Sequence, residues 1–125
     1  MIKKKLILCK LENEIYKIAR YSDDSMFTLA LFLKDGLGFE PYIKFLENEE
    51  RAEFSGNISY IEKKQEKAII FIDDLIFPNQ APFIIAIDDL ITILKEYLNL
   101  YLLGVDEIEI TINEFDQVSV IGKQI

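Results

Sequence analysis

The sequence predicts a single α+β domain over residues 1–125, in which about three helices pack on a mainly antiparallel sheet built from hairpins. The chain has 125 residues, the usual size of one domain. Hydrophobic residues make up 50% of it, so it can bury a sizeable core without a covalent or metal staple. Segments with apolar residues at every second position and segments with a helical period follow in the order ββ-αα-ββ-(β)-α-ββ, which is typical of α+β proteins.

The N-terminal part of the chain predicts a β-hairpin and two helices. Residues 5–21 are rich in strand formers on both sides of the polar turn 12–14, although some apolar residues are also spaced as in a helix. The next segment predicts a helix that begins at one of the capping residues 22–25 and ends at Gly36. A second helix is expected to begin at Glu40-Pro41, because proline suits the first turn of a helix.

The middle of the chain changes to a spacing of two. Residues 57–62 and 67–72 predict a hairpin about the charged turn 63–66. A loop bracketed by two prolines follows. Residues 83–87 then predict either a short strand or an extended entry to the next helix.

The C-terminal part predicts the longest helix and a closing hairpin. Residues 88–103 keep apolar side chains at the helical period, and Gly104 is expected to end this helix. Residues 106–113 and 117–121 predict two strands around the turn 114–116. No linker or low-complexity segment divides the chain, which supports one domain.

The string Ile-Asp-Asp-Leu-Ile occurs twice, at residues 72–76 and 87–91. The two aspartate pairs could hold a divalent metal between them, or each pair could mark the end of an element. Asp88 directly precedes the helical period and is expected to cap the helix, with Asp89 opposing the helix dipole. The pair 73–74 follows a strand and precedes three apolar residues without a periodic position, so it is a candidate contact for a partner.

The charge of the chain is −8 and is unevenly distributed. Residues 1–54 have a net charge of −1 and residues 55–125 a net charge of −7; between Ala68 and Gly122, Lys95 is the single cation against ten acids. This distribution argues against binding nucleic acid or an anionic membrane, and it permits a basic protein partner. No apolar run approaches 18 residues and no cleavage site follows the first one, so a cytoplasmic location is expected.

Catalysis has weak support in the sequence. Histidine is absent and Cys9 is the single cysteine, which removes histidine-based catalysis and the usual zinc sites. Asp73, Asp74, Glu107 and Glu109 would formally suffice for a magnesium site. The cations or glycine-rich loops that a phosphate substrate needs are missing around them. A metal-dependent phosphoesterase is therefore the alternative, and a protein with neither catalysis nor a cofactor is the leading expectation.

The candidate binding residues are acids and aromatic residues of the second half. Glu107 and Glu109 alternate with isoleucines and are first expected on a solvated strand face. Phe115 lies at a hairpin tip, where it either folds back over the sheet edge or forms an exposed anchor among acids. The full set expected to contact a partner is Asp73, Asp74, Phe77, Asp106, Glu107, Glu109, Glu114, Phe115 and Asp116.

Two long segments carry a resemblance to a known class of proteins. They are YSDDSMFTLALFLKDGLGFEPYIKFLENEE and FIIAIDDLITILKEYLNLYLLGVDEIEITINEFDQVSVIG, with the predicted hairpin between them. In the style and order of its elements, the chain resembles small acidic immunity proteins of bacterial contact-dependent growth inhibition and polymorphic toxin systems. The resemblance implies a cytoplasmic protein that binds one cognate toxin domain, often a basic nuclease, and blocks its active site. A non-catalytic adaptor or structural subunit is a further alternative.

Overall fold

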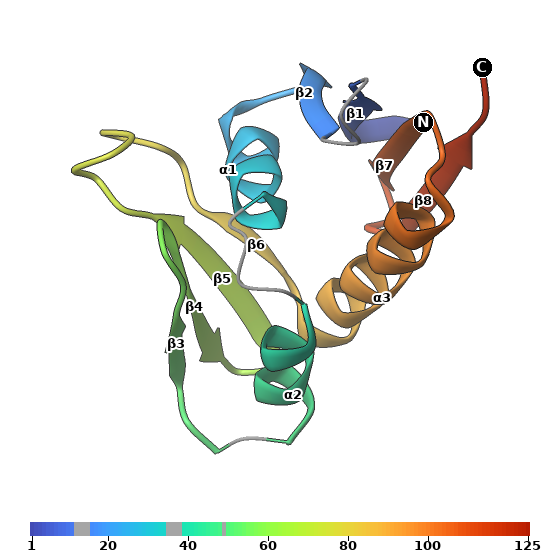
Figure 1. Cartoon of the computed structure of the whole chain (residues 1–125). Coiled ribbons are helices and arrows are strands. Elements are labelled where there is room, and N and C mark those ends of the chain that lie inside the picture. The colour runs from blue at the N-terminus through green and yellow to red at the C-terminus, as the bar shows by residue number, and fades with distance from the viewer. Residues whose placement is uncertain (12–15, 35–38, 49) are drawn as a thin grey trace.

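The computed structural model describes residues 1–11, 16–34, 39–48 and 50–125 (Figure 1). The described chain forms three helices and eight strands. The strands make two antiparallel sheets of four strands each, and the predicted α+β class is confirmed. The helices lie between the two sheets (Figure 1).

Sheet A brings the two ends of the chain together, in the strand order β2-β1-β7-β8. The predicted first and last hairpins are both present in it, whereas the turn expected at residues 12–14 lies outside the described residues. β1 also pairs with β7, from Ile2 opposite Asn113 to Cys9 opposite Glu107. The strands are β1 (Ile2–Lys10), β2 (Tyr16–Tyr21), β7 (Glu107–Asn113) and β8 (Val118–Lys123).

Sheet B has the strand order β3-β4-β5-β6 and contains the predicted middle hairpin. Gln65 and Glu66 form its two-residue turn with φ values of 51° and 62°, as the twist of a tight hairpin requires. The strand β3 had no counterpart among the predicted elements. The strands are β3 (Glu53–Ser55), β4 (Ser59–Lys64), β5 (Lys67–Ile72) and β6 (Phe83–Ala86).

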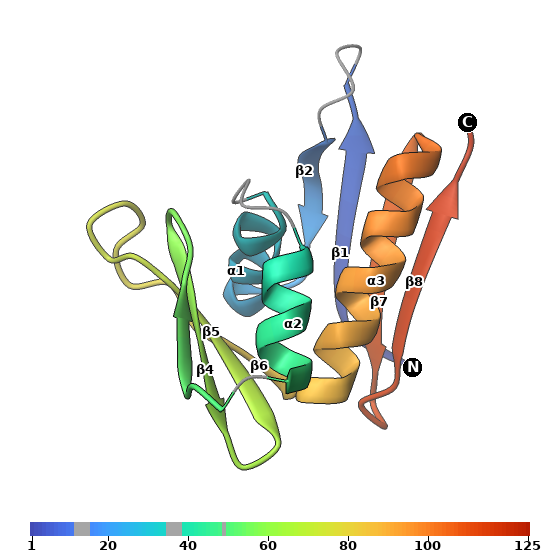
Figure 2. The same ribbon diagram turned by 60° about the horizontal axis from the view of Figure 1, so that its bottom comes forward.

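The three helices supply the layer that both sheets share. They are α1 (Asp24–Leu33), α2 (Glu40–Asn48) and α3 (Ile87–Leu103), and Figure 2 shows them between the sheets. α1 contacts β1 and β2 of one sheet and β5 and β6 of the other, which explains why its sequence is apolar almost all round. Alternate side chains of both sheets point at the helices and are buried. Leu8 and Ile110 are examples in sheet A, and Ile61 and Ile70 in sheet B.

The ends of α1 follow from its sequence in part. Asp23 is the N-cap residue, and its carboxylate accepts a hydrogen bond of 3.0 Å from the backbone N–H of Met26. The helix ends at Leu33, with Lys34 as the C-cap. The predicted stop at Gly36 lies outside the described residues.

The predicted start of α3 is wrong by one residue. The helix begins at Ile87, its N-cap is Ala86, and the carboxylate of Asp88 does not cap it. The reason is that β6 continues directly into the helix, and the N–H of Ile87 donates to the carbonyl of Glu66 at 3.0 Å. Asp88 and Asp89 still lie in the first turn, where they oppose the helix dipole. Gly104 ends the helix as predicted, in the left-handed conformation at φ 70°.

Close packing of α3 on β8 depends on the glycine at position 122. A Cβ atom there would lie 2.6 Å from Cδ2 of Leu100 and 3.2 Å from Cγ1 of Val105. We expect Gly122→Ala to lower the free energy of unfolding by about 1–2 kcal/mol, because the helix or its side chains must move away. Urea unfolding measures this effect, with Ser119→Ala on the same strand as a control that stays close to the wild type. A Gly122→Ala protein as stable as that control would contradict close packing at this position.

Candidate functional site

The nine predicted contact residues do not form one surface. Asp73, Asp74 and Phe77 belong to the loop between β5 and β6. The other six lie on or beside β7 in the other sheet, and they are themselves spread along that strand. Asp106 and Glu114 flank its two ends, which are about 23 Å apart for a strand of this length. The carboxylate of Asp106 accepts a hydrogen bond of 2.8 Å from the N–H of Ile125.

Glu107 and Glu109 lie on the outer face of sheet A and are paired with lysines of the same sheet. Nζ of Lys123 lies 2.8 Å from Oε2 of Glu109 and 3.6 Å from Oε2 of Glu107, and Nζ of Lys5 lies 3.6 Å from Oε1 of Glu109. The hydrogen bond from Lys123, followed by the charges of both lysines, lowers the pKa of Glu109 although partial burial opposes the shift. The folded chain therefore supplies cations that lie outside the acidic stretch of sequence.

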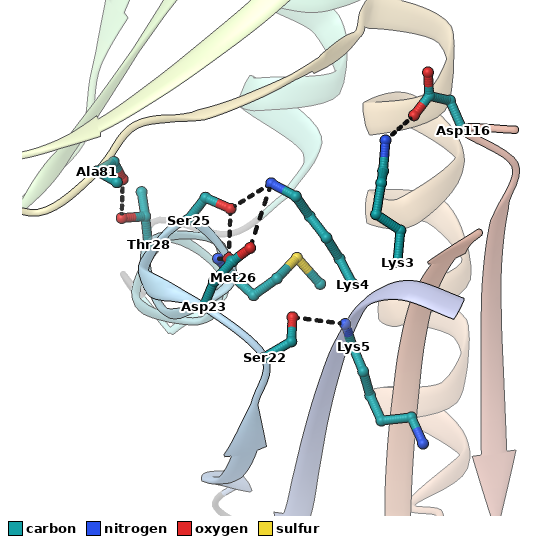
Figure 3. Close-up of polar contacts among 10 residues, drawn as sticks. All are labelled: Lys3, Lys4, Lys5, Ser22, Asp23, Ser25, Met26, Thr28, Ala81 and Asp116. Atoms are coloured by element: carbon teal, nitrogen blue, oxygen red, sulfur yellow. Dashed lines mark hydrogen bonds and ion pairs between the residues drawn. The ribbon is translucent and has the colours of Figure 1, made fainter. Parts of the chain in front are cut away.

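Two acids at the hairpin tip between β7 and β8 also have cationic partners. Lys3 on β1 donates a hydrogen bond to Asp116 (Figure 3), and the N-terminal amine lies 3.5 Å from Oε1 of Glu114. Phe115 between these acids is 75% exposed, so it does not fold back over the sheet edge. The tip thus presents an exposed aromatic ring between two acids that already have cationic neighbours.

The loop between β5 and β6 exposes both predicted aspartates. The carboxylate of Asp73 accepts a hydrogen bond of 3.0 Å from the N–H of Leu75, which holds the turn that presents Asp74. The ring of Phe77 packs edge-on against Phe27 of α1, with the ring centroids 6.0 Å apart. Phe77 therefore anchors the loop, and the loop presents Leu75 and Ile76 to solvent, with Leu75 93% exposed.

The outer face of sheet B carries a group of apolar side chains that were not among the predicted contact residues. Tyr60 on β4 stacks on Phe71 of β5, with centroids 4.8 Å apart and an interplanar angle of 14°. On the same face, Ile69 is paired with Ile84 of β6, which is 57% exposed. Figure 2 shows helices on one side of sheet B and none on the other. We call Tyr60, Ile69, Phe71 and Ile84 the sheet B face.

One feature of the sequence does indicate this face. Residues 68–72 are apolar at every position, whereas a strand with one solvated face usually alternates apolar and polar residues. Such a run fits a strand covered on both faces. In the structure only one face is covered by the helices, and Ala68, Ile70 and Ile72 are buried on it. The side chains of Ile69 and Phe71 are left on the other.

Four carboxylates gather around Tyr60, and we call them the rim acids: Glu53, Glu62, Asp73 and Asp74. Partial desolvation, and then the charges of Glu62, Asp74, Glu53 and Asp73, raise the pKa of Tyr60. All four therefore lie close enough to act on its hydroxyl group. Within the described part of the chain, none of the rim acids forms an ion pair.

The rim acids include one unfavourable arrangement. Glu53 and Glu62 stand directly opposite each other on β3 and β4, and like charges in this position repel. Two cations of the same face, Lys64 and Lys67, form the next opposed pair and lie beside the hairpin turn. The sheet B face therefore has an acidic end at Tyr60 and a basic end at the turn.

A metal centre is not apparent in the described residues. Among them, no three or more acidic or cysteine side chains are grouped so that they could hold a metal ion, and the two aspartate pairs of the repeated string do not form such a group. On sheet A, the ammonium group of Lys123 already lies within 3.6 Å of both Glu107 and Glu109.

No protein-family model matches this chain, and no curated protein or solved structure matches it significantly. Among the residues that the structure describes, no helix has the length and apolar character to cross a membrane. The function is therefore inferred from the surface itself, and the sheet B face with its rim acids is the candidate functional site.

The loop that carries two rim acids depends on a hydrogen bond to α1. Oγ1 of Thr28, which is fully buried in α1, donates to the carbonyl of Ala81 at 2.6 Å (Figure 3). We expect Thr28→Val to remove about 1–2 kcal/mol of local stability, because the partly buried carbonyl of Ala81 loses its donor. Hydrogen exchange at the amides of Ile76 and Phe77 should become about 5–30 times faster. Thr28→Ser keeps the donor and should leave these rates unchanged; equal rates in the Thr28→Val protein would contradict the anchoring role.

The paired carboxylate of Glu109 should make the stability of the protein depend on acid pH. Because its pKa in the folded state is lowered, Glu109 contributes stability that is complete above its ordinary pKa of 4.5 and is lost as the pH falls through the lower folded value. Glu109→Gln should therefore destabilise the protein at pH 7 and flatten the loss of stability below about pH 4.5. Thermal unfolding across this range measures both effects. Lys123→Met should act in the same direction, and an unchanged acid profile in both variants would disprove the coupling.

Proposed function

We propose that the protein is an immunity-type inhibitor that binds a cognate basic toxin domain and occludes it, without catalysis of its own. One observation supports this proposal most strongly. The sheet B face is a partly exposed aromatic and aliphatic surface, and the four acids around it have no ion-pair partner among the described residues. Both features suit a surface that is covered by a positively charged protein.

The two kinds of side chain would have different roles in binding. Aromatic and aliphatic anchors at the centre of an interface usually provide most of the affinity. Clustered acids steer a basic partner to the surface and fix its orientation. A standard interface covers about 800 Å² on each partner, roughly a tenth of the 7428 Å² of this chain. Leu75 and Ile76 extend the apolar surface beyond the sheet toward that size.

Only some of the predicted contact residues belong to the proposed interface. We assign Asp73 and Asp74 to the proposed interface, and we add Glu53 and Glu62 because they lie beside Tyr60 on the same face. The acids around β7 are a weaker choice, because lysines and the N-terminus already neutralise most of them. Phe115 remains a second candidate anchor, on the tip of the hairpin between β7 and β8.

Neutralising the opposed acids should raise stability and weaken binding at the same time. Glu53→Gln with Glu62→Gln removes the repulsion between β3 and β4, and should stabilise the free protein by about 0.2–1 kcal/mol. The control is Glu66→Gln with Glu96→Gln, at two exposed positions away from the rim acids. Both double variants change the net charge of the chain from −8 to −6. Thermal unfolding measures the gain; a rim variant less stable than its control would contradict the repulsion.

Co-expression tests the function itself. The test needs a neighbouring gene that encodes a large secreted protein ending in a toxin-like domain, and that domain is the partner to use. Wild-type protein should restore growth of cells that express this domain. At low salt, the Glu53→Gln, Glu62→Gln variant should associate about tenfold or more slowly than the control, because steering depends on local charge. Failure of the wild-type protein to restore growth would disprove the proposed function, and equal association rates would place the interface elsewhere.

A further inference from the structure

One face of the Tyr60 ring is left uncovered by the stacking with Phe71. The two rings are nearly parallel and their centroids are 4.8 Å apart, which is about the spacing of neighbouring strands. Phe71 on β5 therefore covers one face of Tyr60, and the second face is directed toward β3 on the opposite side of β4.

The residue on that side is small. Ser55 of β3 is paired with Tyr60 and is exposed, so its side chain leaves space against the ring. Glu53 and Glu62, the next outward pair on the same two strands, stand about 7 Å further along. The space above Ser55 is thus bounded by an aromatic face on one side and by two carboxylates at one end. We call this space the Ser55 slot.

We propose that the Ser55 slot binds the guanidinium group of an arginine presented by the basic partner. This inference rests on the proposed function and names the group that the sheet B face recognises. The planar guanidinium would stack on Tyr60 and donate hydrogen bonds to the carboxylates of Glu53 and Glu62. Its charge would also offset the repulsion between those two acids.

The surrounding charges determine where the cation lies. The four rim acids raise the pKa of Tyr60, and the same negative potential that disfavours a phenolate favours a cation at this position. At the other end of the face, Lys64 and Lys67 would repel it. The nearest arginine of the chain, Arg51, lies over Phe45 and Phe54, whose rings pack toward the core on the opposite side of the sheet.

Arginine fits the Ser55 slot better than lysine for geometric reasons. A guanidinium group is flat, is weakly hydrated and presents several N–H donors in one plane, so it can stack and form hydrogen bonds at the same time. An ammonium group is a strongly hydrated point charge without a face to stack. A partner with lysine in place of this arginine should therefore bind less tightly, although its net charge is the same.

Titration of the full-length protein with short peptides tests this proposal. The probes are acetyl-Gly-Arg-Gly-amide, the same peptide with lysine, and the same peptide with citrulline, which keeps the shape of arginine but has no charge. NMR shifts of the Tyr60 and Phe71 ring signals report binding. We expect the arginine peptide to bind about fivefold more tightly than the lysine peptide, and the citrulline peptide to cause no saturable shift.

Substitutions at Ser55 provide the matched variants. Ser55→Leu fills the slot and should abolish the shift caused by the arginine peptide, whereas Ser55→Ala keeps the slot open and should preserve it. Ser55 is exposed on an edge strand, so both variant proteins should unfold at nearly the wild-type temperature. Tyr60→Leu should also abolish arginine selectivity while keeping an apolar side chain. Equal binding of arginine and lysine, or a Ser55→Leu protein that binds like the wild type, would overturn the proposal.

The outcome is separable from that of the proposed function. If the toxin domain is neutralised equally by wild-type and Ser55→Leu proteins, arginine recognition in the slot is wrong and the inhibitor function stands. If the arginine peptide binds selectively but the toxin domain is not neutralised, the slot is correct and the partner is of another class.

Discussion

The architecture depends on one constraint, which is that three helices must cover two sheets. α1 contacts strands of both sheets and is buried over most of its length, so the helices act as a shared core layer. Each sheet consequently has one face against the helices and one face in water (Figure 2). The pairing of β1 with β7 joins the N-terminal and C-terminal hairpins into sheet A. It also brings the lysines of β1 beside the acids of β7. The properties of the two outer faces follow from this arrangement.

The outer faces of the two sheets expose different kinds of side chain to water. The outer face of sheet A pairs its acids with lysines, as Glu109 does with Lys5 and Lys123. A partner that covered such pairs would have to remove water from charges that are already neutralised, and would gain little. The sheet B face instead leaves stacked aromatic rings and isoleucines in water, beside acids without counter-ions in the described part of the chain. Covering it with a basic surface would bury apolar area and supply the missing cations together.

The opposed pair of Glu53 and Glu62 illustrates a conflict between stability and binding. Two carboxylates across neighbouring strands weaken the sheet when the protein is alone. The same two groups become favourable acceptors once a cation lies between them. Surfaces that serve binding commonly keep arrangements that cost some stability in the free protein. The position of Ser55 beside this pair adds a steric condition to the electrostatic one.

The local pattern of residues determined the helices, the hairpins and the class of the fold. Apolar spacing located α1, α2 and α3, and the capping carboxylate of Asp23 and the left-handed Gly104 are properties of their own short segments. Tertiary structure decided which hairpins share a sheet, because strand pairing such as that of β1 with β7 joins residues about a hundred positions apart in the sequence. It also decided the site. Charges counted along the chain predicted an unpaired acidic half, but distance in space is what screens a charge, and β1 placed lysines beside those acids. The exposed face of β5 could not be told from its buried face by sequence, because both are apolar and only the position of the helices distinguishes them.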